Sequence, residues 1–405
     1  MNDQMSIFSL MYERKIIKKP IRLIELFAGI GSQLRALQVI FGKENVESYK
    51  ICEWAYPSYK AYNYIHIKDF KDYSKGKSLE EIIAKVRGTS LNYNEPIADK
   101  QLTRKGEKWL RDAYNNIVAT HNLVNVMEVH GKDLEIVDTD KYEYVLTYSF
   151  PCQDLSLAGK RAGMEISQAD GGTRSGLLWE VERILDELNR ERERERDVST
   201  HLPQVLIMEN VPEVVGSGNL KHFQKWREKL EKLGYSNYDA ILNAKDYGIP
   251  QNRRRCFMVS VLGEYHYDFP IENKLKYHLK DFLEKVVDEK YYLSQKMINY
   301  ISATGTKDFS VNNSEINCSI SRPLTTEQNK RAGTTNYVCD ELPENYDLRK
   351  LRIKNNTKQG YLEATFGDGI DIGGRMANHR GTVQKGLSQT IKTNCDIGVV
   401  VKNEN

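Results

Sequence analysis

The chain has 405 residues, 40% of them hydrophobic, and a formal net charge of +3. That length suffices for two domains with ordinary cores, and the small net charge excludes a generally polycationic protein, so nucleic-acid binding would need local basic patches. Six scattered cysteines without a Cys-x-x-Cys pair argue against a zinc site or a disulfide framework, and the absence of a long apolar stretch or a cleavable leader indicates an intracellular protein that spans no membrane.

The first two-thirds of the chain alternate short apolar runs with longer amphipathic ones. The runs predict strands and helices in alternation, with the strands at 22–26, 48–52, 144–147, 205–208 and 256–261 and the helices at 34–41, 79–86 and 176 to about 196. This order is typical of a parallel sheet with helices on both faces. We therefore predict an α/β fold with a doubly wound, mostly parallel, Rossmann-like sheet in residues 1–262, interrupted by a charged helical insertion at about 60–130.

The composition changes from residue 263 onward. Gly, Asn and Thr become frequent, and segments such as SRPLTTEQNKRAGTTNYV indicate short strands joined by turns. The sequence thus predicts a second, smaller, mainly β domain over 263–405.

The first candidate site lies in IRLIELFAGIGSQLRAL, residues 21–37. Gly29 and Gly31 occupy a predicted strand-to-helix turn, where glycine lets the backbone approach a ligand closely. The next strand ends in Glu53 and Trp54, which could bind ribose hydroxyls and stack on adenine. Together these features favour an adenosine-containing cofactor over a plain tight turn, with Asp133 as a candidate partner for the adenine amino group.

A second candidate is the thiol in TYSFPCQDLS. Cys152 follows a predicted strand and Pro151. Cysteine is commonly a small buried hydrophobe, but a core cysteine would lie inside the strand. A thiol at the carboxyl edge of a parallel sheet is placed where α/β proteins bind ligands, and it needs a nearby cation or general acid to react.

Suitable partners follow two later strands. QVLIMENVPEV ends a buried strand in Glu209, a carboxylate that could hold a proton at the mouth of the sheet. QNRRRCFMVSV carries Arg253 and Arg255, which share one face of an extended chain. A basic surface loop is the alternative for these arginines.

In this order, FAGIGS, PCQ, ENV and QNRRR resemble the motifs of DNA (cytosine-5) methyltransferases, in particular the bacterial and phage-borne enzymes with an SFPCQDLS nucleophile motif. TRSGLLWE, residues 173–180, is similar to the family motif that follows the catalytic loop. The resemblance implies a catalytic domain that uses S-adenosylmethionine and a target-recognition domain after it. The cofactor residues that it implies are Phe27, Gly29, Ile30, Gly31, Glu53, Trp54, Asp133, Leu134, Pro151 and Leu177.

The resemblance also implies the chemistry. Cys152 would attack C6 of a cytosine flipped out of double-stranded DNA, Glu209 would act at N3, Arg255 would hold O2 and Arg253 would support the site. The mobile loop would follow Cys152 and close over the DNA. Candidate DNA contacts in the second domain, each also explicable as a solvated surface charge, are Arg322, Lys330, Arg331, Arg349, Lys350, Arg352, Lys354 and Arg380.

The C-terminal part departs from the family pattern. Family members continue past a strand resembling residues 388–401 to a Gly-Asn-Ser motif that completes the cofactor pocket, and this chain has no such motif. We expect a truncated form or a second polypeptide that supplies the motif, and weak activity for the chain alone. The leading expectation is a cytoplasmic bacterial or phage-encoded enzyme, monomeric on DNA, in restriction-modification or solitary modification. The alternatives are tRNA methylation and an inactive module that binds only cofactor or DNA.

Overall fold

A computed structural model describes the chain in one long part and several short ones. The described residues are 15–151, 174–194, 201–288, 292–294, 318–323, 336, 338, 351–354, 357–358, 361–364, 369–371, 382–384 and 397–399. Two compact units are present: Met1–Leu242 with Arg254–Pro270, and Asn243–Arg253 with Ile271–Asn405. None of the described helices is long and apolar enough to cross a membrane.

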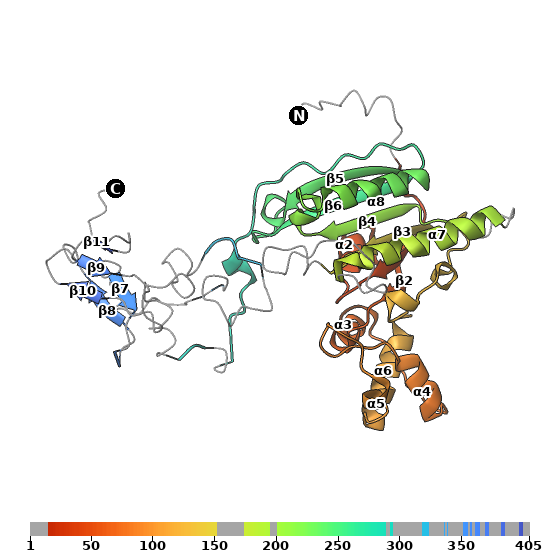
Figure 1. Cartoon of the computed structure of the whole chain (residues 1–405), viewed down its shortest axis with the longest axis horizontal. Coiled ribbons are helices and arrows are strands. Elements are labelled where there is room, and N and C mark those ends of the chain that lie inside the picture. Colours follow the sequence, from red (N-terminus) through yellow and green to blue (C-terminus); the bar gives the residue numbers. More distant parts are fainter. Residues whose placement is uncertain are drawn as a thin grey trace. The chain divides into compact units, whose positions relative to one another are not determined.

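A six-stranded sheet forms the centre of the first unit (Figure 1). Its strands, in the order β2-β1-β3-β4-β6-β5 across the sheet, are β1 (Ile21–Leu26), β2 (Val46–Cys52), β3 (Glu143–Tyr148), β4 (Val205–Asn210), β5 (Tyr235–Asn243) and β6 (Arg254–Leu262). The first four pair in parallel, whereas β6 runs antiparallel to β4. The predicted α/β fold with a mostly parallel sheet is confirmed, and β5 is a strand that the sequence did not predict.

Helices pack on both faces because alternate residues of each strand point to opposite sides. On β3, Tyr144, Leu146 and Tyr148 join the core beneath α7 (Leu178–Arg194) and α8 (Leu220–Lys232). Val145 joins the other core, beneath α2 (Ser32–Phe41) and α3 (Tyr56–Tyr62). Helices therefore exclude solvent from both faces of the sheet, which explains why its central strands are almost continuously apolar.

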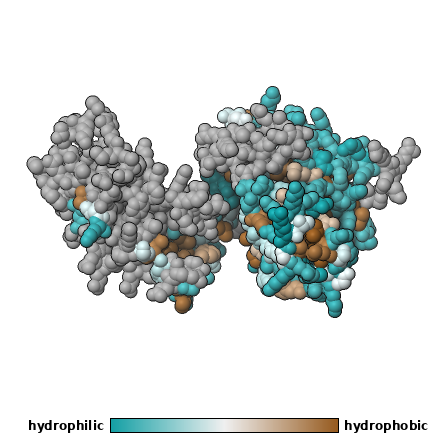
Figure 2. Space-filling view, turned by 60° about the horizontal axis from the view of Figure 1, so that its bottom comes forward, coloured by the Kyte–Doolittle hydropathy of each residue, from teal (hydrophilic) through white to brown (hydrophobic). Residues whose placement is uncertain are grey.

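The segment between β2 and β3, where the sequence predicts a helical insertion at about 60–130, contains several helices and 3-10 turns. Its elements are the π-helical η2 (Asn63–Ile67), α4 (Leu79–Val86), α5 (Asp99–Leu102), α6 (Glu107–Ala119), and the 3-10 turns η3 (Val126–Glu128) and η4 (Gly131–Leu134). A capping box at Ser78 and Glu81 starts α4, which pairs the first amides of that helix with side chains. Figure 2 brings this region forward and shows a hydrophilic surface interrupted by hydrophobic areas.

The remaining elements are short. Further 3-10 turns are η1 (Lys43–Asn45), η6 (Arg174–Leu177), η7 (Pro212–Val215), η8 (Ala244–Asp246) and η9 (Leu279–Phe282). The second unit contains β7 (Leu351–Lys354), β8 (Tyr361–Ala364), β9 (Gly369–Asp371), β10 (Thr382–Gln384) and β11 (Ile397–Val399). They form an antiparallel pair β7-β8 and a three-stranded sheet β10-β9-β11.

Candidate active site

The carboxyl ends of the parallel strands lie level with one another. Leu26 of β1 pairs with Cys52 of β2 and with Tyr148 of β3. Tyr148 in turn pairs with Met208 of β4. The residues that come next along each strand therefore emerge at one edge of the sheet, where open α/β proteins bind their ligands.

The turn after β1 has a left-handed backbone. Phe27, Gly29 and Gly31 have φ angles of 61°, 57° and 85°. A β-carbon at Gly29 would meet no atom within 4 Å, whereas one at Gly31 would come within 2.6 Å of the His66 ring. Gly29 thus leaves open space beside the turn, and Gly31 permits close packing against η2.

Glu53 connects this turn to the end of β2. Its Oε2 accepts a hydrogen bond from the Gly29 N–H and its Oε1 accepts one from the Ala55 N–H, both at 2.8 Å. The residue is only 9% exposed, and burial raises the pKa of its carboxyl to about 7, despite the two bonds that favour the charged form. Each oxygen keeps capacity for a further donor.

A cavity of about 250 Å³ opens beside Glu53. It is lined by Phe27, Cys52, Glu53, Trp54, Tyr93, Val124, Asn125, Val126, Met127, Ser149, Pro151 and Leu177. Of the predicted cofactor residues, the structure brings five to this cavity, namely Phe27, Glu53, Trp54, Pro151 and Leu177. They come from four separate elements of the chain, so the cavity wall is assembled only by folding.

Three other predicted residues belong to the turn after β1 but are absent from the cavity lining. Gly29 touches the site through its bond to Glu53. The Ile30 side chain is 53% exposed, and the Ile30 carbonyl pairs with His66 Nε2 at 2.9 Å. Gly31 packs against the same histidine. These residues shape the turn, and the structure does not show them facing the cavity.

In the segment before β3, Asp133 and Leu134 do not line the cavity, although both are predicted cofactor residues. Asp133 accepts a hydrogen bond from the His130 N–H at 2.8 Å and so caps its own turn, and Leu134 is fully buried in the core. The structure brings neither of them to the cavity. Asn125 and Val126, which the sequence did not single out, line it instead. Tyr93, from the helical insertion, was missed as well, because an insertion carries no motif by which to recognise it.

Glu209 and Arg255 form an ion pair at the same edge of the sheet. Arg255 Nε lies 2.9 Å from Glu209 Oε1, and both side chains are about three-quarters buried. The antiparallel pairing of β6 with β4 produces this contact, because Asn210 pairs with Cys256 and thereby brings the flanking residues together. Asn210 donates from Nδ2 to the Phe150 carbonyl at 3.0 Å, which fixes the backbone just before Pro151.

The two other predicted catalytic residues, Cys152 and Arg253, are not part of this ion pair. Cys152 and the loop after it, up to residue 173, lie outside the described residues, although Cys152 is peptide-bonded to the cavity residue Pro151. Arg253 comes directly before β6, among the residues of the second unit, and its carbonyl accepts a hydrogen bond from the Ala244 N–H.

The predicted DNA contacts are only partly described. Arg322 exchanges two hydrogen bonds with the Asn336 side chain through its backbone, and Arg352 and Lys354 belong to β7. The others lie outside the described residues, namely Lys330, Arg331, Arg349, Lys350 and Arg380.

Comparison with known families decides the class of protein. The model of the C-5 cytosine-specific DNA methylases matches residues 78–366, well over half of the chain. The chain belongs to this family. It is a DNA cytosine-5 methyltransferase, as the motifs predicted, and DNA is its substrate.

Several curated methyltransferases are similar to this one over most of its length. The orphan methyltransferase M.SssI of Spiroplasma monobiae is 36% identical over 283 residues, which are 68% of each chain. The type II methyltransferase M2.ScrFI of Lactococcus lactis subsp. cremoris is 34% identical over 311 residues, covering 71% of this methyltransferase and 79% of the relative.

Proposed function

We propose that this chain transfers a methyl group from S-adenosylmethionine to C5 of a cytosine flipped out of a specific double-stranded DNA sequence. The observation that carries the proposal is the cavity at the carboxyl edge of the sheet. It combines a buried carboxylate, Glu53, with two aromatic side chains, Phe27 and Trp54, and it includes Pro151, the residue bonded to the candidate nucleophile.

The cavity has the chemistry that adenosine requires. The oxygens of Glu53 can accept hydrogen bonds from two ribose hydroxyls, since each is engaged by only one backbone N–H. Phe27 and Trp54 offer apolar faces for the adenine ring, and Asn125 supplies a polar group on another wall. Asp133 and Leu134 stay predictions as cofactor residues. S-adenosylmethionine, when bound, supplies an electrophilic methyl group on a sulfonium.

The reaction itself is assigned to residues of this chain. The Cys152 thiolate adds to C6 of the cytosine, which makes C5 nucleophilic. Glu209 hydrogen-bonds N3 and so stabilises the charge that develops on the ring, while Arg255 orients Glu209 and binds the cytosine O2. After C5 is methylated, its proton passes to a water molecule, the electrons of the C5–H bond form the C5–C6 double bond, and the C6–S bond breaks to release the Cys152 thiolate and restore aromaticity. Arg253 is proposed to support this arrangement.

Residues 263–405 are proposed as the target-recognition domain, and basic residues in this range are proposed to contact DNA. Because the two relatives above are bacterial, we place the reaction in a bacterial cytoplasm, in restriction-modification or as a solitary activity. The second polypeptide with a C-terminal motif stays a prediction, as does a monomeric complex on DNA.

The deciding experiment measures transfer of labelled methyl from S-adenosylmethionine to unmethylated DNA, with Cys152→Ala as the partner variant. We expect 5-methylcytosine with the wild-type chain and none with Cys152→Ala, since the thiolate adduct is needed to activate C5. Label on adenine or on cytosine N4 would contradict the proposal, as would unchanged transfer by Cys152→Ala. If the wild-type chain alone is inactive, adding the C-terminal segment of a relative tests the second-polypeptide prediction.

A further inference from the structure

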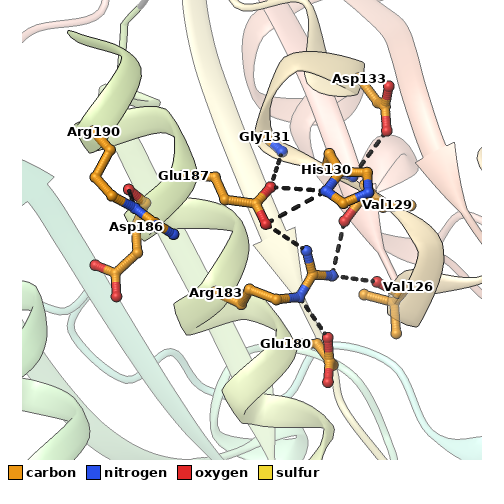
Figure 3. A network of polar contacts seen from close by, with 10 residues as sticks. All are labelled: Val126, Val129, His130, Gly131, Asp133, Glu180, Arg183, Asp186, Glu187 and Arg190. Atoms are coloured by element: carbon orange, nitrogen blue, oxygen red, sulfur yellow. Dashed lines mark hydrogen bonds and ion pairs between the residues drawn. The ribbon is translucent and has the colours of Figure 1, made fainter. Parts of the chain in front are cut away.

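Beyond the residues of the reaction, a polar network joins the cavity wall to helix α7. It links the segment of η3 and η4 to the first three turns of the helix (Figure 3). Arg183 is at its centre and does not line the cavity itself. We propose that Arg183 is a positioning residue, which holds one wall of the proposed cofactor cavity in place before the cofactor binds. This inference rests on the proposed function.

The wall in question has little regular structure of its own. Asn125, Val126 and Met127 line the cavity, and they belong to a segment built from short 3-10 turns. Such turns make few internal backbone bonds, so their position depends on outside donors. Arg183 is one: its Nη2 donates to the carbonyl of Val126 at 3.2 Å and to that of Val129 at 2.8 Å.

The guanidinium is itself fixed by two carboxylates of α7. Its Nε donates to Glu180 at 2.8 Å and its Nη1 donates to Glu187 at 2.9 Å. The second oxygen of Glu187 accepts the Gly131 N–H at 2.8 Å, so the helix holds the segment at both of its ends (Figure 3). Partial burial acts to raise the pKa of Glu187, but the Gly131 N–H and the guanidinium outweigh it and lower that pKa, which keeps the pair charged.

The close packing of Gly131 is independent evidence that the η4 turn has a fixed position on helix α7. A β-carbon at Gly131 would lie 2.9 Å from the Leu188 nitrogen and 3.1 Å from the Ile184 carbonyl oxygen, both backbone atoms of α7. The turn therefore lies directly on the helix, at a distance that only glycine permits.

Helix α7 is also connected to another lining residue of the cavity. Leu177, which lines the cavity, comes directly before the helix, six residues from Arg183. Arg183 thus ties the segment that contains Val126 and Met127 to the helix that follows Leu177. Without it, the cofactor would have to order this wall on binding, and that cost would appear as weaker affinity without any change in the reacting groups.

The test compares Arg183→Met with wild type in two measurements. Calorimetric titration with S-adenosylmethionine should give a dissociation constant about tenfold higher, while kcat at saturating cofactor stays within about twofold. Hydrogen exchange without cofactor should show faster exchange in residues 125–131 and unchanged exchange in β1 and β3. Arg183→Lys should recover only part of the affinity, because one ammonium cannot bridge two carbonyls and two carboxylates.

Arg190→Met is the matched control. Arg190 lies on the same helix, and its Nε donates to the Asp186 carbonyl of that helix at 3.3 Å (Figure 3). The Arg190→Met variant should have the wild-type affinity for S-adenosylmethionine and the wild-type hydrogen exchange. The inference is overturned if Arg183→Met binds S-adenosylmethionine as tightly as wild type, or if residues 125–131 of this variant exchange as slowly as in wild type. If that variant does not fold, Arg183→Lys decides in the same two measurements. If the wild-type chain binds no S-adenosylmethionine even after the C-terminal segment of a relative is added, the proposed function is overturned, and the exchange result alone then decides the inference.

Discussion

Two glutamates at the ends of neighbouring strands differ in what surrounds them. Glu25, near the end of β1, and Glu53, just after β2, are both buried, and burial raises the pKa of each to about 7. Glu25 is fully enclosed: it accepts hydrogen bonds from the Tyr62 hydroxyl at 2.5 Å and from the Leu34 N–H at 3.2 Å. Among the described residues, the donors to Glu53 are the backbone N–H groups of Gly29 and Ala55, and Glu53 lines the cavity.

We infer that this difference separates a structural carboxylate from one that can bind the proposed cofactor. The partners of Glu25 fasten α2 and the end of α3 to the sheet, and the enclosure leaves no path to a ligand. The partners of Glu53 hold the turn after β1 and leave the carboxylate open on one side. We therefore expect substitutions at Glu25 to change the free energy of unfolding and substitutions at Glu53 to change cofactor affinity.

The largest effect is expected for Glu25→Ala. Removing the carboxylate leaves the Tyr62 hydroxyl and the Leu34 N–H without this acceptor in a dry core, which should cost about 3 kcal/mol of unfolding free energy. Chemical denaturation of the variant measures this loss. Cofactor affinity at a temperature where the variant is folded should change by less than about threefold, and a large loss of affinity would break the distinction between the two glutamates.

The same residue should make stability depend on pH. Its folded pKa of about 7 is raised above the unfolded value, so the contribution is fully present below about pH 4.5 and is lost as the pH rises through 7, by up to about 3 kcal/mol. Glu25→Gln should remove the contribution of Glu25 to this slope and leave that of Glu53, whose pKa is also raised to about 7. Unfolding curves at several pH values between 5 and 8 would show the change.

Glu53→Gln should act on binding. Ribose hydroxyls favour the charged carboxylate, so the affinity of wild type for S-adenosylmethionine should rise by about tenfold between pH 6 and pH 8, as the group with a pKa of about 7 ionises. The glutamine variant should bind about 30-fold more weakly at pH 8, since a charge-assisted bond is lost, and its affinity should not vary with pH. Titration of Glu25→Gln is the control, and it should keep the wild-type pH dependence.

The smallest effects are expected at Gly29 and Gly31. One of these glycines contacts Glu53, and the other contacts a partner of Glu25. Gly29 donates to Glu53, whereas Gly31 packs against Tyr62, the partner of Glu25. Alanine at either position costs about 1 kcal/mol for its left-handed backbone. Gly31→Ala should lose more, because its β-carbon would lie 2.7 Å from the Tyr62 ring. Thermal unfolding of both variants checks this order, and equal losses would contradict it.

Sequence patterns located the parts of this protein that local chemistry defines. The buried runs around Leu23, Val145 and Leu206 predicted the strands β1, β3 and β4, because their residues are apolar on both faces. Strand β5, at the edge of the sheet, is only half-buried and mixes polar with apolar residues, so no run indicated it. Among the cavity residues, Phe27, Glu53, Trp54, Pro151 and Leu177 were predicted, whereas Tyr93, Asn125 and the rest were not.

The sequence by itself determined the approximate positions of five strands, the motif order and the residue types that the chemistry needs, because these depend on neighbours along the chain. Only the tertiary structure decided that Glu25 is enclosed while Glu53 faces a cavity. It also decided that Asp133 caps its own turn and that Arg183 binds the wall beside it. Those outcomes depend on which distant segments meet at the edge of the sheet, and contacts such as Glu53 with Gly29 or Arg183 with Val129 exist only after the chain has folded.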